Sequence, residues 1–212
     1  MAYPPLPYRP KDERFIASIV REHPFATLFT AGGGLHATRL PVLVDMEEGQ
    51  PLRLRAHVNA RNPQAGLLDG GDVLVSFTGP HTYVSPHWRA DKGRGGTWNF
   101  TGVNIRGTAR LRPEPDFFRA LVNDLSALVE PQYAEIGDYP VWTDAMAPDG
   151  YIERLLPQLT AFEVDVTAVE PVAMLHQDYS AEDRRSVVDH LSRSSREGAR
   201  AIAEMIRTDD EQ

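Results

Sequence analysis

The chain has 212 residues, a formal net charge of −8 at pH 7 and no cysteine. That length allows one compact domain, or one domain with an appendage. Without cysteine, disulfides, thiolate metal ligands and a cysteine nucleophile are excluded. No run of residues approaches the roughly 18 apolar positions that a membrane span requires, and the N-terminus lacks the apolar segment of a signal peptide. We therefore expect a cytoplasmic protein that does not interact with membranes.

The charge distribution argues against a strongly electrostatic nucleic-acid-binding protein, because affinity for DNA depends on neutralising phosphates. Residues 178–212 hold nine Asp or Glu and six Arg. A DNA-recognition helix presents a basic face, whereas this segment is acidic on balance. A solvated helix packed on the rest of the protein is the expected structure of the tail, and direct DNA binding is doubtful.

The first half of the chain alternates between short strands and turns. A helix is expected to begin at the cap residue Asp12 and to end before Pro24. Strands are expected over residues 25–30, 36–45 and 52–58, where apolar residues alternate. Pro63 suits the first turn of a short helix that runs through residue 68.

The second half begins with strands and ends with helices. Strands are expected over 73–77, 81–85 and 100–112, with a break at Gly79-Pro80 between the first two. From Asp116 the apolar period becomes helical, and a second short helix is expected over 151–156. Residues 159–169 return to strand alternation, and the remainder after Asp178 is charged and helical.

Six or seven short strands with peripheral helices favour a small closed barrel over a doubly wound sheet. The sequence shows no β-α-β alternation and no G-x-G-x-x-G motif, and a Rossmann site therefore has no support. The histidines lack the spacing of a metal site, so no metal is expected.

The segment 72–112 combines aromatic and polar residues beside predicted strand ends. It contains His81, Tyr83, Trp88, Trp98 and Phe100. Apolar faces for stacking, with donors at the rim, are what a flat and partly anionic ligand requires. The same aromatic residues also fit an ordinary hydrophobic core, and periodicity alone does not separate the two interpretations.

Four motifs in this order carry a family resemblance. They are T-R-L-P at 38–41, H-x-x-x-x-N-P-Q at 57–64, G-P-H-x-Y-x-S at 79–85 and T-W-N at 97–99. Together they resemble the PaiB family, described as FMN-binding negative transcriptional regulators with a split β-barrel fold. The resemblance spans roughly residues 1–175, which implies an FMN-binding split-barrel domain there and a helical tail over 176–212.

The resemblance also implies the cofactor and its ligands. It implies one non-covalent FMN per subunit in a homodimer, with an anionic phosphate, a ribityl chain and a flat ring to be bound. Arginine, side-chain amides and a helix start suit the phosphate, and Trp98 and Asn99 are expected to cover the open side, across a dimer interface. The implied cofactor-binding residues are Thr38, Arg39, Leu40, Pro41, His57, Val58, Asn62, Gln64, Trp98 and Asn99.

Several of these residues have a second interpretation. Asn62-Pro63-Gln64 is also a turn with a helix cap, and His57 is also a buried strand histidine. His81 and Tyr83 lie on one strand face, from which they reach a flavin edge or stabilise the Gly79-Pro80 turn. Two functions stay open. The first is a flavin-binding regulatory protein with DNA or, since direct DNA binding is doubtful, another protein as its partner. The second is an FMN-dependent oxidoreductase or flavin reductase whose catalytic residues the sequence does not identify.

Overall fold

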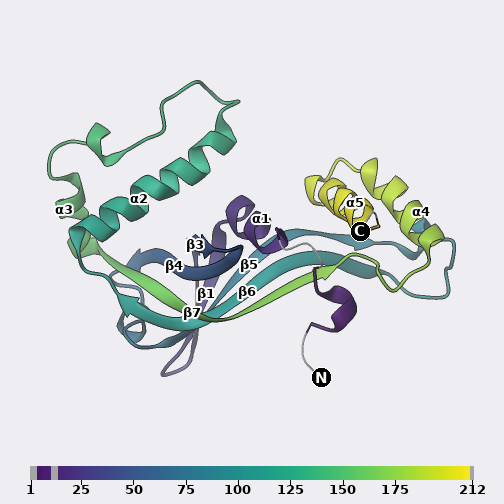
Figure 1. Ribbon diagram of the computed structural model, residues 1–212, viewed down its shortest axis with the longest axis horizontal. Coiled ribbons are helices and arrows are strands. Elements are labelled where there is room, and N and C mark those ends of the chain that lie inside the picture. The colour runs from purple at the N-terminus through teal and green to yellow at the C-terminus, as the bar shows by residue number, and fades with distance from the viewer. Residues whose placement is uncertain (1–3, 11–13, 211–212) are drawn as a thin grey trace. The chain divides into compact units, whose positions relative to one another are not determined.

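The computed structural model, which describes residues 4–10 and 14–210, contains one seven-stranded sheet with antiparallel pairing. The strand order is β2-β1-β5-β6-β7-β4-β3, and Figure 1 shows β5, β6 and β7 as its long strands. The strands are β1 (Phe25–Ala31), β2 (Leu35–Pro41), β3 (Leu43–Glu47), β4 (Gln50–Asn59), β5 (Asp72–Val84), β6 (Thr97–Leu111) and β7 (Leu159–Met174).

The two ends of this strand order are covalent neighbours. β2 ends at Pro41 and β3 begins at Leu43, with only Val42 between them. Strands at opposite edges of a sheet can be joined by one residue only if the sheet curls until its edges meet, which is how a barrel forms. Val42 is buried, and its N–H donates to the carbonyl oxygen of Pro24 at 2.9 Å. The sheet is therefore a small barrel, as the sequence predicted.

The chain divides into two compact units. Val20–Phe77 and Asn104–Val169 form what we call the barrel unit. The described parts of Met1–Ile19, Thr78–Val103 and Glu170–Gln212 form the second unit. β5, β6 and β7 contribute one part to each unit.

The α-helices lie where the sequence predicted them, but the short helix expected through residue 68 is not among them. The expected helix before Pro24 is α1 (Phe15–Glu22), although its proposed cap Asp12 lies outside the described residues. The remaining α-helices are α2 (Pro115–Val129), α3 (Tyr151–Leu155), α4 (Ala181–Ser192) and α5 (Glu197–Asp210). None of the described helices is long and apolar enough to cross a membrane.

The barrel unit has an apolar interior and one helix-covered flank. Leu28, Leu54 and Phe162 are among its fully buried side chains. Phe118 and Leu121 of α2 form a buried cluster with Leu43, Ile152 and Ala161. This cluster follows from the 3–4-residue apolar period of α2, which places one stripe of the helix against β3 and β7.

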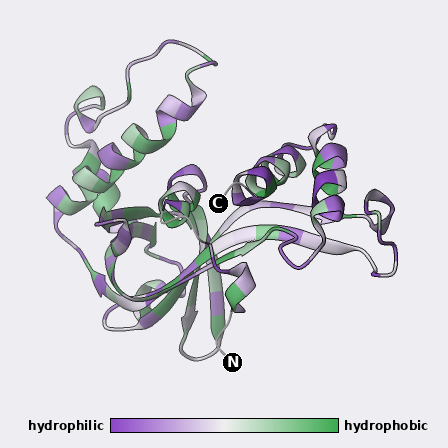
Figure 2. Ribbon diagram, turned by 45° about the vertical axis from the view of Figure 1, so that its right-hand side comes forward, coloured by the Kyte–Doolittle hydropathy of each residue, from purple (hydrophilic) through white to green (hydrophobic). Residues whose placement is uncertain are grey.

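The second unit has a core of its own, between the helical tail and strand ends. Val187 and Leu191 of α4 and Ile202 and Ile206 of α5 are buried together with Val84 of β5. Both helices carry hydrophobic and hydrophilic residues along their length (Figure 2), which is the pattern of helices with one buried side. Ser180 caps α4 by accepting a hydrogen bond from the Asp183 N–H at 3.1 Å.

Two predicted strand boundaries were wrong. The segment 36–45 is not one strand but β2 and β3, separated at Val42. Conversely, β5 continues through Gly79-Pro80, where a turn was expected. Gly79 is buried, and a side chain there would overlap Thr101 and Ile19. Glycine thus serves close packing at this position, whereas the sequence pattern suggested that it serves a turn.

Candidate functional site

The outward face of the β1–β2 hairpin in the barrel unit is exposed and largely apolar. Phe25 and Phe29 point outward from β1, whereas Ala26 and Leu28, on the opposite face of the same strand, are buried. Phe25 is 65% exposed and Leu35, on β2, is 92% exposed. Directly paired antiparallel residues share a face. The pairing therefore defines what we call the hairpin face: Phe25, Thr27, Phe29, Leu35, Ala37, Arg39 and Pro41.

Arg39 is the cation of the hairpin face. It pairs with Thr27, so its nearest cross-strand diagonal neighbours on that face are Phe25 and Phe29. The side chain is exposed, and within residues 4–10 and 14–210 it makes no ion pair or side-chain hydrogen bond. An exposed guanidinium on the same strand face as two aromatic side chains is suited to an anionic group attached to a flat apolar one.

The turn after β4 is fixed by its own amide side chains. Asn62 donates from Nδ2 to the Thr38 hydroxyl at 2.8 Å and accepts at Oδ1 from the Gln64 N–H at 2.9 Å. Gln64 is buried, and its Nε2 donates to the Leu28 carbonyl and to the Thr30 hydroxyl. The expected short helix is a single 3-10 turn over Ala65–Leu67. The structure therefore brings Thr38, Asn62 and Gln64 together, and it uses their polar groups to attach the turn to β1 and β2.

His57 lies against a helix. Its ring meets the ring of Phe118 on α2 edge-on, with centroids 5.4 Å apart. Burial lowers the pKa of His57, because the charged imidazolium loses its hydration there. Its neighbour Val58 points into the barrel, as does Leu40 on β2. Of the residues predicted on these two strands, Arg39 and Pro41 thus lie on the hairpin face, while Leu40 and Val58 belong to the barrel interior.

The second unit carries an exposed aromatic group. The ring of Trp98 on β6 lies 6.0 Å from that of His81 and 6.3 Å from that of Tyr83, both on β5. All three side chains are exposed, Trp98 by 54%. We call these three residues the aromatic patch. His81 and Tyr83 belong to the G-P-H-x-Y-x-S motif at 79–85, and Trp98 belongs to the T-W-N motif at 97–99.

Asn99 lies on the other side of β6 from Trp98, because successive strand residues point to opposite faces. It is fully buried, and its Oδ1 accepts a hydrogen bond of 2.8 Å from the Nδ1–H of His176. The structure therefore separates the two residues that the sequence placed together as a cover. Trp98 faces solvent, and Asn99 faces the interior of the second unit.

Sequence reasoning did not single out Phe25 and Phe29. A signal was present, because the segment Phe25–Thr30 has apolar residues at both odd and even positions. A strand with only one buried face alternates apolar with polar residues. Phenylalanine on the outward positions is therefore unexplained by the barrel core and points to a ligand or partner.

The residue types that bind metals are not clustered in the described part of the chain. No group of three or more His, Asp or Glu there is arranged to hold a metal ion.

Comparison with known proteins places this geometry in a family. The sequence model of the family described as "Putative FMN-binding domain" matches residues 2–168. The chain is 27% identical over 206 residues to the protease synthase and sporulation protein PAI 2 of Bacillus subtilis, covering 96% of each chain. The chain belongs to the PaiB family. The resemblance predicted from the four motifs is thereby confirmed.

Solved structures agree with the PaiB split-barrel fold. A conserved hypothetical protein of Mycobacterium tuberculosis superposes with a TM-score of 0.54 at 16% identity, covering 84% of this chain and 94% of that one. The FAD and heme binding protein of Mycobacterium smegmatis superposes with a TM-score of 0.52 at 15% identity, covering 78% and 72%. At these identities the likeness shows the fold, which is the split β-barrel with peripheral helices that the sequence predicted.

Proposed function

We propose that this PaiB-family protein binds FMN on the hairpin face and acts as a flavin-dependent regulatory protein. The single observation that carries the proposal is Arg39, an exposed guanidinium without a partner among the described residues, paired with Thr27 on a face that also presents Phe25 and Phe29. The aromatic rings suit the isoalloxazine, and the guanidinium suits the phosphate. The residues present therefore fit the cofactor that the family description names.

The predicted cofactor residues on β2, on β4 and in the turn after β4 each have a role in this proposal, whereas the buried Asn99 has none. Arg39 holds the phosphate, and Pro41 extends the apolar surface. Thr38, Asn62 and Gln64 fix the turn that borders the site. Burial lowers the pKa of His57 and so favours its neutral form. Leu40 and Val58 support the strands from inside. When bound, the flavin supplies redox chemistry, and the protein supplies its position.

We further propose that the protein is a homodimer in which Trp98 of one copy covers the flavin of the other. Support comes from two exposed apolar surfaces, the hairpin face and the aromatic patch, each of which loses water contact when covered. Homodimers are the commonest symmetric assemblies, and a twofold arrangement buries both surfaces twice. Light scattering of the flavin-loaded protein tests this point, with a mass near twice 23.6 kDa as the expected result.

The experiment for the cofactor is a titration of the purified protein with FMN, followed by flavin fluorescence. We expect saturable binding of one FMN per chain, and no fluorescence change would refute the proposal. Addition of NAD(P)H to the complex separates the two functions that the sequence left open. Persistent yellow colour is expected for a regulatory protein, whereas turnover-dependent bleaching would identify an oxidoreductase.

A further inference from the structure

A cluster of buried polar side chains lies inside the second unit, apart from the residues assigned to the flavin by the hairpin-face proposal. Arg89 follows the 3-10 turn Pro86–Trp88, Asn99 lies in β6, and His176 and Tyr179 follow β7. The side chains of Arg89, Asn99 and His176 are 2%, 0% and 1% exposed. Three polar side chains at this depth require a complete set of hydrogen-bond partners, or they cost folding free energy.

Arg89 lacks such a set. Its Nη2 donates to the carbonyl oxygens of Arg94 and Gly95, at 2.7 and 2.5 Å, while Nε and Nη1 have no hydrogen-bond partner. The guanidinium carbon lies 4.9 Å from the centre of the Tyr179 ring. No carboxylate of the described residues forms an ion pair with it. The buried Asp183 carboxylate interacts with Arg89 through charge alone, and the Arg89 charge helps to lower the pKa of Asp183. A buried guanidinium with two unused N–H groups and no directly bonded carboxylate favours an anion.

His176 and Asn99 leave two further atoms unpaired. The Nδ1–H of His176 donates to Asn99 Oδ1, but His176 Nε2 and Asn99 Nδ2 have no partner. The imidazole stacks on Tyr179, with ring centroids 4.1 Å apart. Both rings of this stack and the Arg89 guanidinium therefore belong to one cluster, and its unpaired atoms are mostly nitrogen donors.

We propose that Arg89, Asn99 and His176 form a binding site for a small oxyanion of the phosphate class. Arg89 supplies the charge, and the Asn99 amide supplies a neutral donor. The exposed glycine-rich loop that contains Arg94 and Gly95 covers the site, because its carbonyl oxygens hold Arg89 Nη2. Movement of this loop admits the anion to the remaining guanidinium donors.

Protonation of His176 is coupled to the anion. Burial and the neighbouring Arg89 lower the pKa of His176 to about 4, with Arg184 acting in the same direction and Asp178 and Asp183 opposing it. An anion beside Arg89 offsets the positive charge and raises that pKa. His176 then takes up a proton and becomes a further donor to the anion, so binding is accompanied by proton uptake and strengthens as pH falls.

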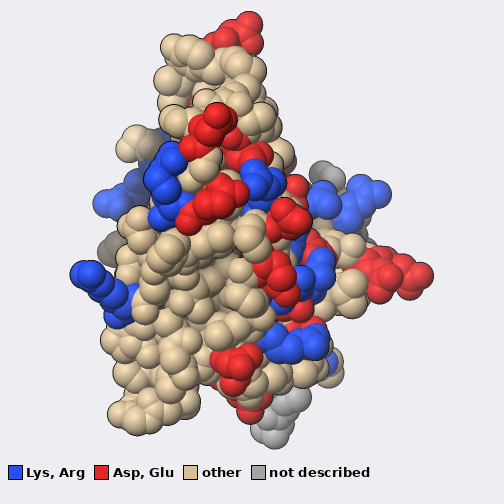
Figure 3. Space-filling model, turned by 90° about the vertical axis from the view of Figure 1, so that its left-hand side faces the viewer, with Lys and Arg blue, Asp and Glu red and all other residues tan. Residues whose placement is uncertain are grey.

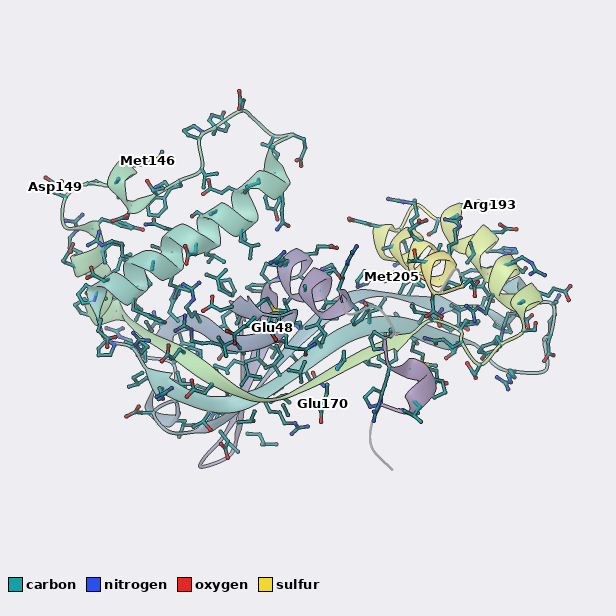
Figure 4. The ribbon with its side chains drawn as sticks, viewed as in Figure 1. Glu48, Met146, Asp149, Glu170, Arg193 and Met205 are labelled. Carbon is teal, nitrogen blue, oxygen red and sulfur yellow. The ribbon has the colours of Figure 1, made fainter. Side chains whose placement is uncertain are left out.

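Thermal unfolding and calorimetry of the full chain test the site with inorganic phosphate, against sodium chloride at equal ionic strength. We expect phosphate to raise the melting temperature of the wild type and of Arg193→Gln. Arg193 is an exposed arginine at the end of α4 (Figure 4) and serves as the matched control for loss of one charge. In Arg89→Gln, we expect phosphate affinity to fall at least about tenfold, as for loss of one charged hydrogen bond. Equal affinity in Arg89→Gln and wild type would overturn the proposal.

A second measurement needs no variant. Sulfate does not titrate between pH 5 and 8, so its binding heat in buffers of different ionisation enthalpy counts the protons that the protein takes up. We expect net proton uptake when sulfate binds. A separate titration with glycerol phosphate in place of inorganic phosphate distinguishes a site for a free anion from a site for the phosphate group of a larger metabolite. No effect of either oxyanion on the wild type would overturn the proposal. Because the hairpin face is not involved, the FMN titration keeps its outcome in either case.

Discussion

Nδ2 of Asn62 donates to Oγ1 of Thr38 at 2.8 Å, which joins the turn after β4 to the middle of β2. The same side chain accepts from the Gln64 N–H. Both bonds are internal to the barrel unit, and Thr38 is half-buried. The asparagine therefore has a structural role that is measurable in the absence of any cofactor.

We expect Asn62→Ala to lower the free energy of unfolding by about 1–2 kcal/mol, because two partly buried hydrogen bonds are lost and the Thr38 hydroxyl loses its donor. Urea denaturation of the cofactor-free protein measures this. Arg61→Ala is the control, since the Arg61 side chain is exposed and next in sequence. Equal midpoints for the two variants would contradict the structural role.

Gly107 permits close approach of two strands in the barrel unit. A methyl group there would overlap the backbone carbonyl of Asp165 on β7, whereas a methyl group at Gly66 meets nothing. We expect Gly107→Ala to destabilise the protein by about 1–3 kcal/mol, since the backbone cannot move aside as a flexible side chain does. Gly66→Ala should be nearly neutral. Thermal denaturation of the two variants measures the difference. A Gly107→Ala protein as stable as Gly66→Ala would show that β6 and β7 lie farther apart at this position than in the structure.

The buried His176 predicts a pH dependence of stability. Its pKa falls from 6.5 to about 4 on folding, so between those values the unfolded state binds more protons than the folded state. Stability is therefore fully present above pH 6.5, declines as pH falls toward 4, and loses up to about 3 kcal/mol from this group. NMR titration of the imidazole measures the pKa directly. A midpoint near 6.5 in the folded protein would contradict the burial.

Four arginines that could contact DNA phosphates are paired with carboxylates of the protein. Arg53 and Arg55 pair with Asp45, Arg94 pairs with Asp178, and Arg184 pairs with Asp209 and Asp210. On the face drawn in Figure 3, acidic and basic side chains are interspersed. We expect no sub-micromolar binding to duplex DNA at about 150 mM salt, because few phosphates would be neutralised. A fluorescence-anisotropy titration with promoter DNA checks this, and tight, sequence-selective binding would contradict it.

The sequence predicted the elements better than their ends. Strand alternation and the helical stripes identified the strands and the α-helices, because these patterns reflect which side chains are buried. The sequence pattern gave the wrong prediction at Gly79-Pro80, because a Gly-Pro pair occurs both in turns and in closely packed strands. Only the position of Thr101 and Ile19 in space separates those two cases.

The candidate site was less predictable for the same physical reason. Arg39 and Pro41 were recognisable from the T-R-L-P motif, but Phe25 joins them only through strand pairing. Arg89 and His176 are far apart in sequence, and their burial in one cluster depends on tertiary packing. Local patterns carry no information about such pairs.

The most direct test of the central claim compares FMN with riboflavin, which lacks the phosphate, on the wild type and on Arg39→Gln. If Arg39 binds the phosphate, Arg39→Gln weakens FMN by about 10- to 100-fold, which corresponds to loss of a charged hydrogen bond, and leaves riboflavin affinity unchanged. Arg193→Gln should bind both flavins as the wild type does. Unchanged FMN affinity in Arg39→Gln, or equal losses for FMN and riboflavin, would contradict the assignment of the hairpin face as the flavin site.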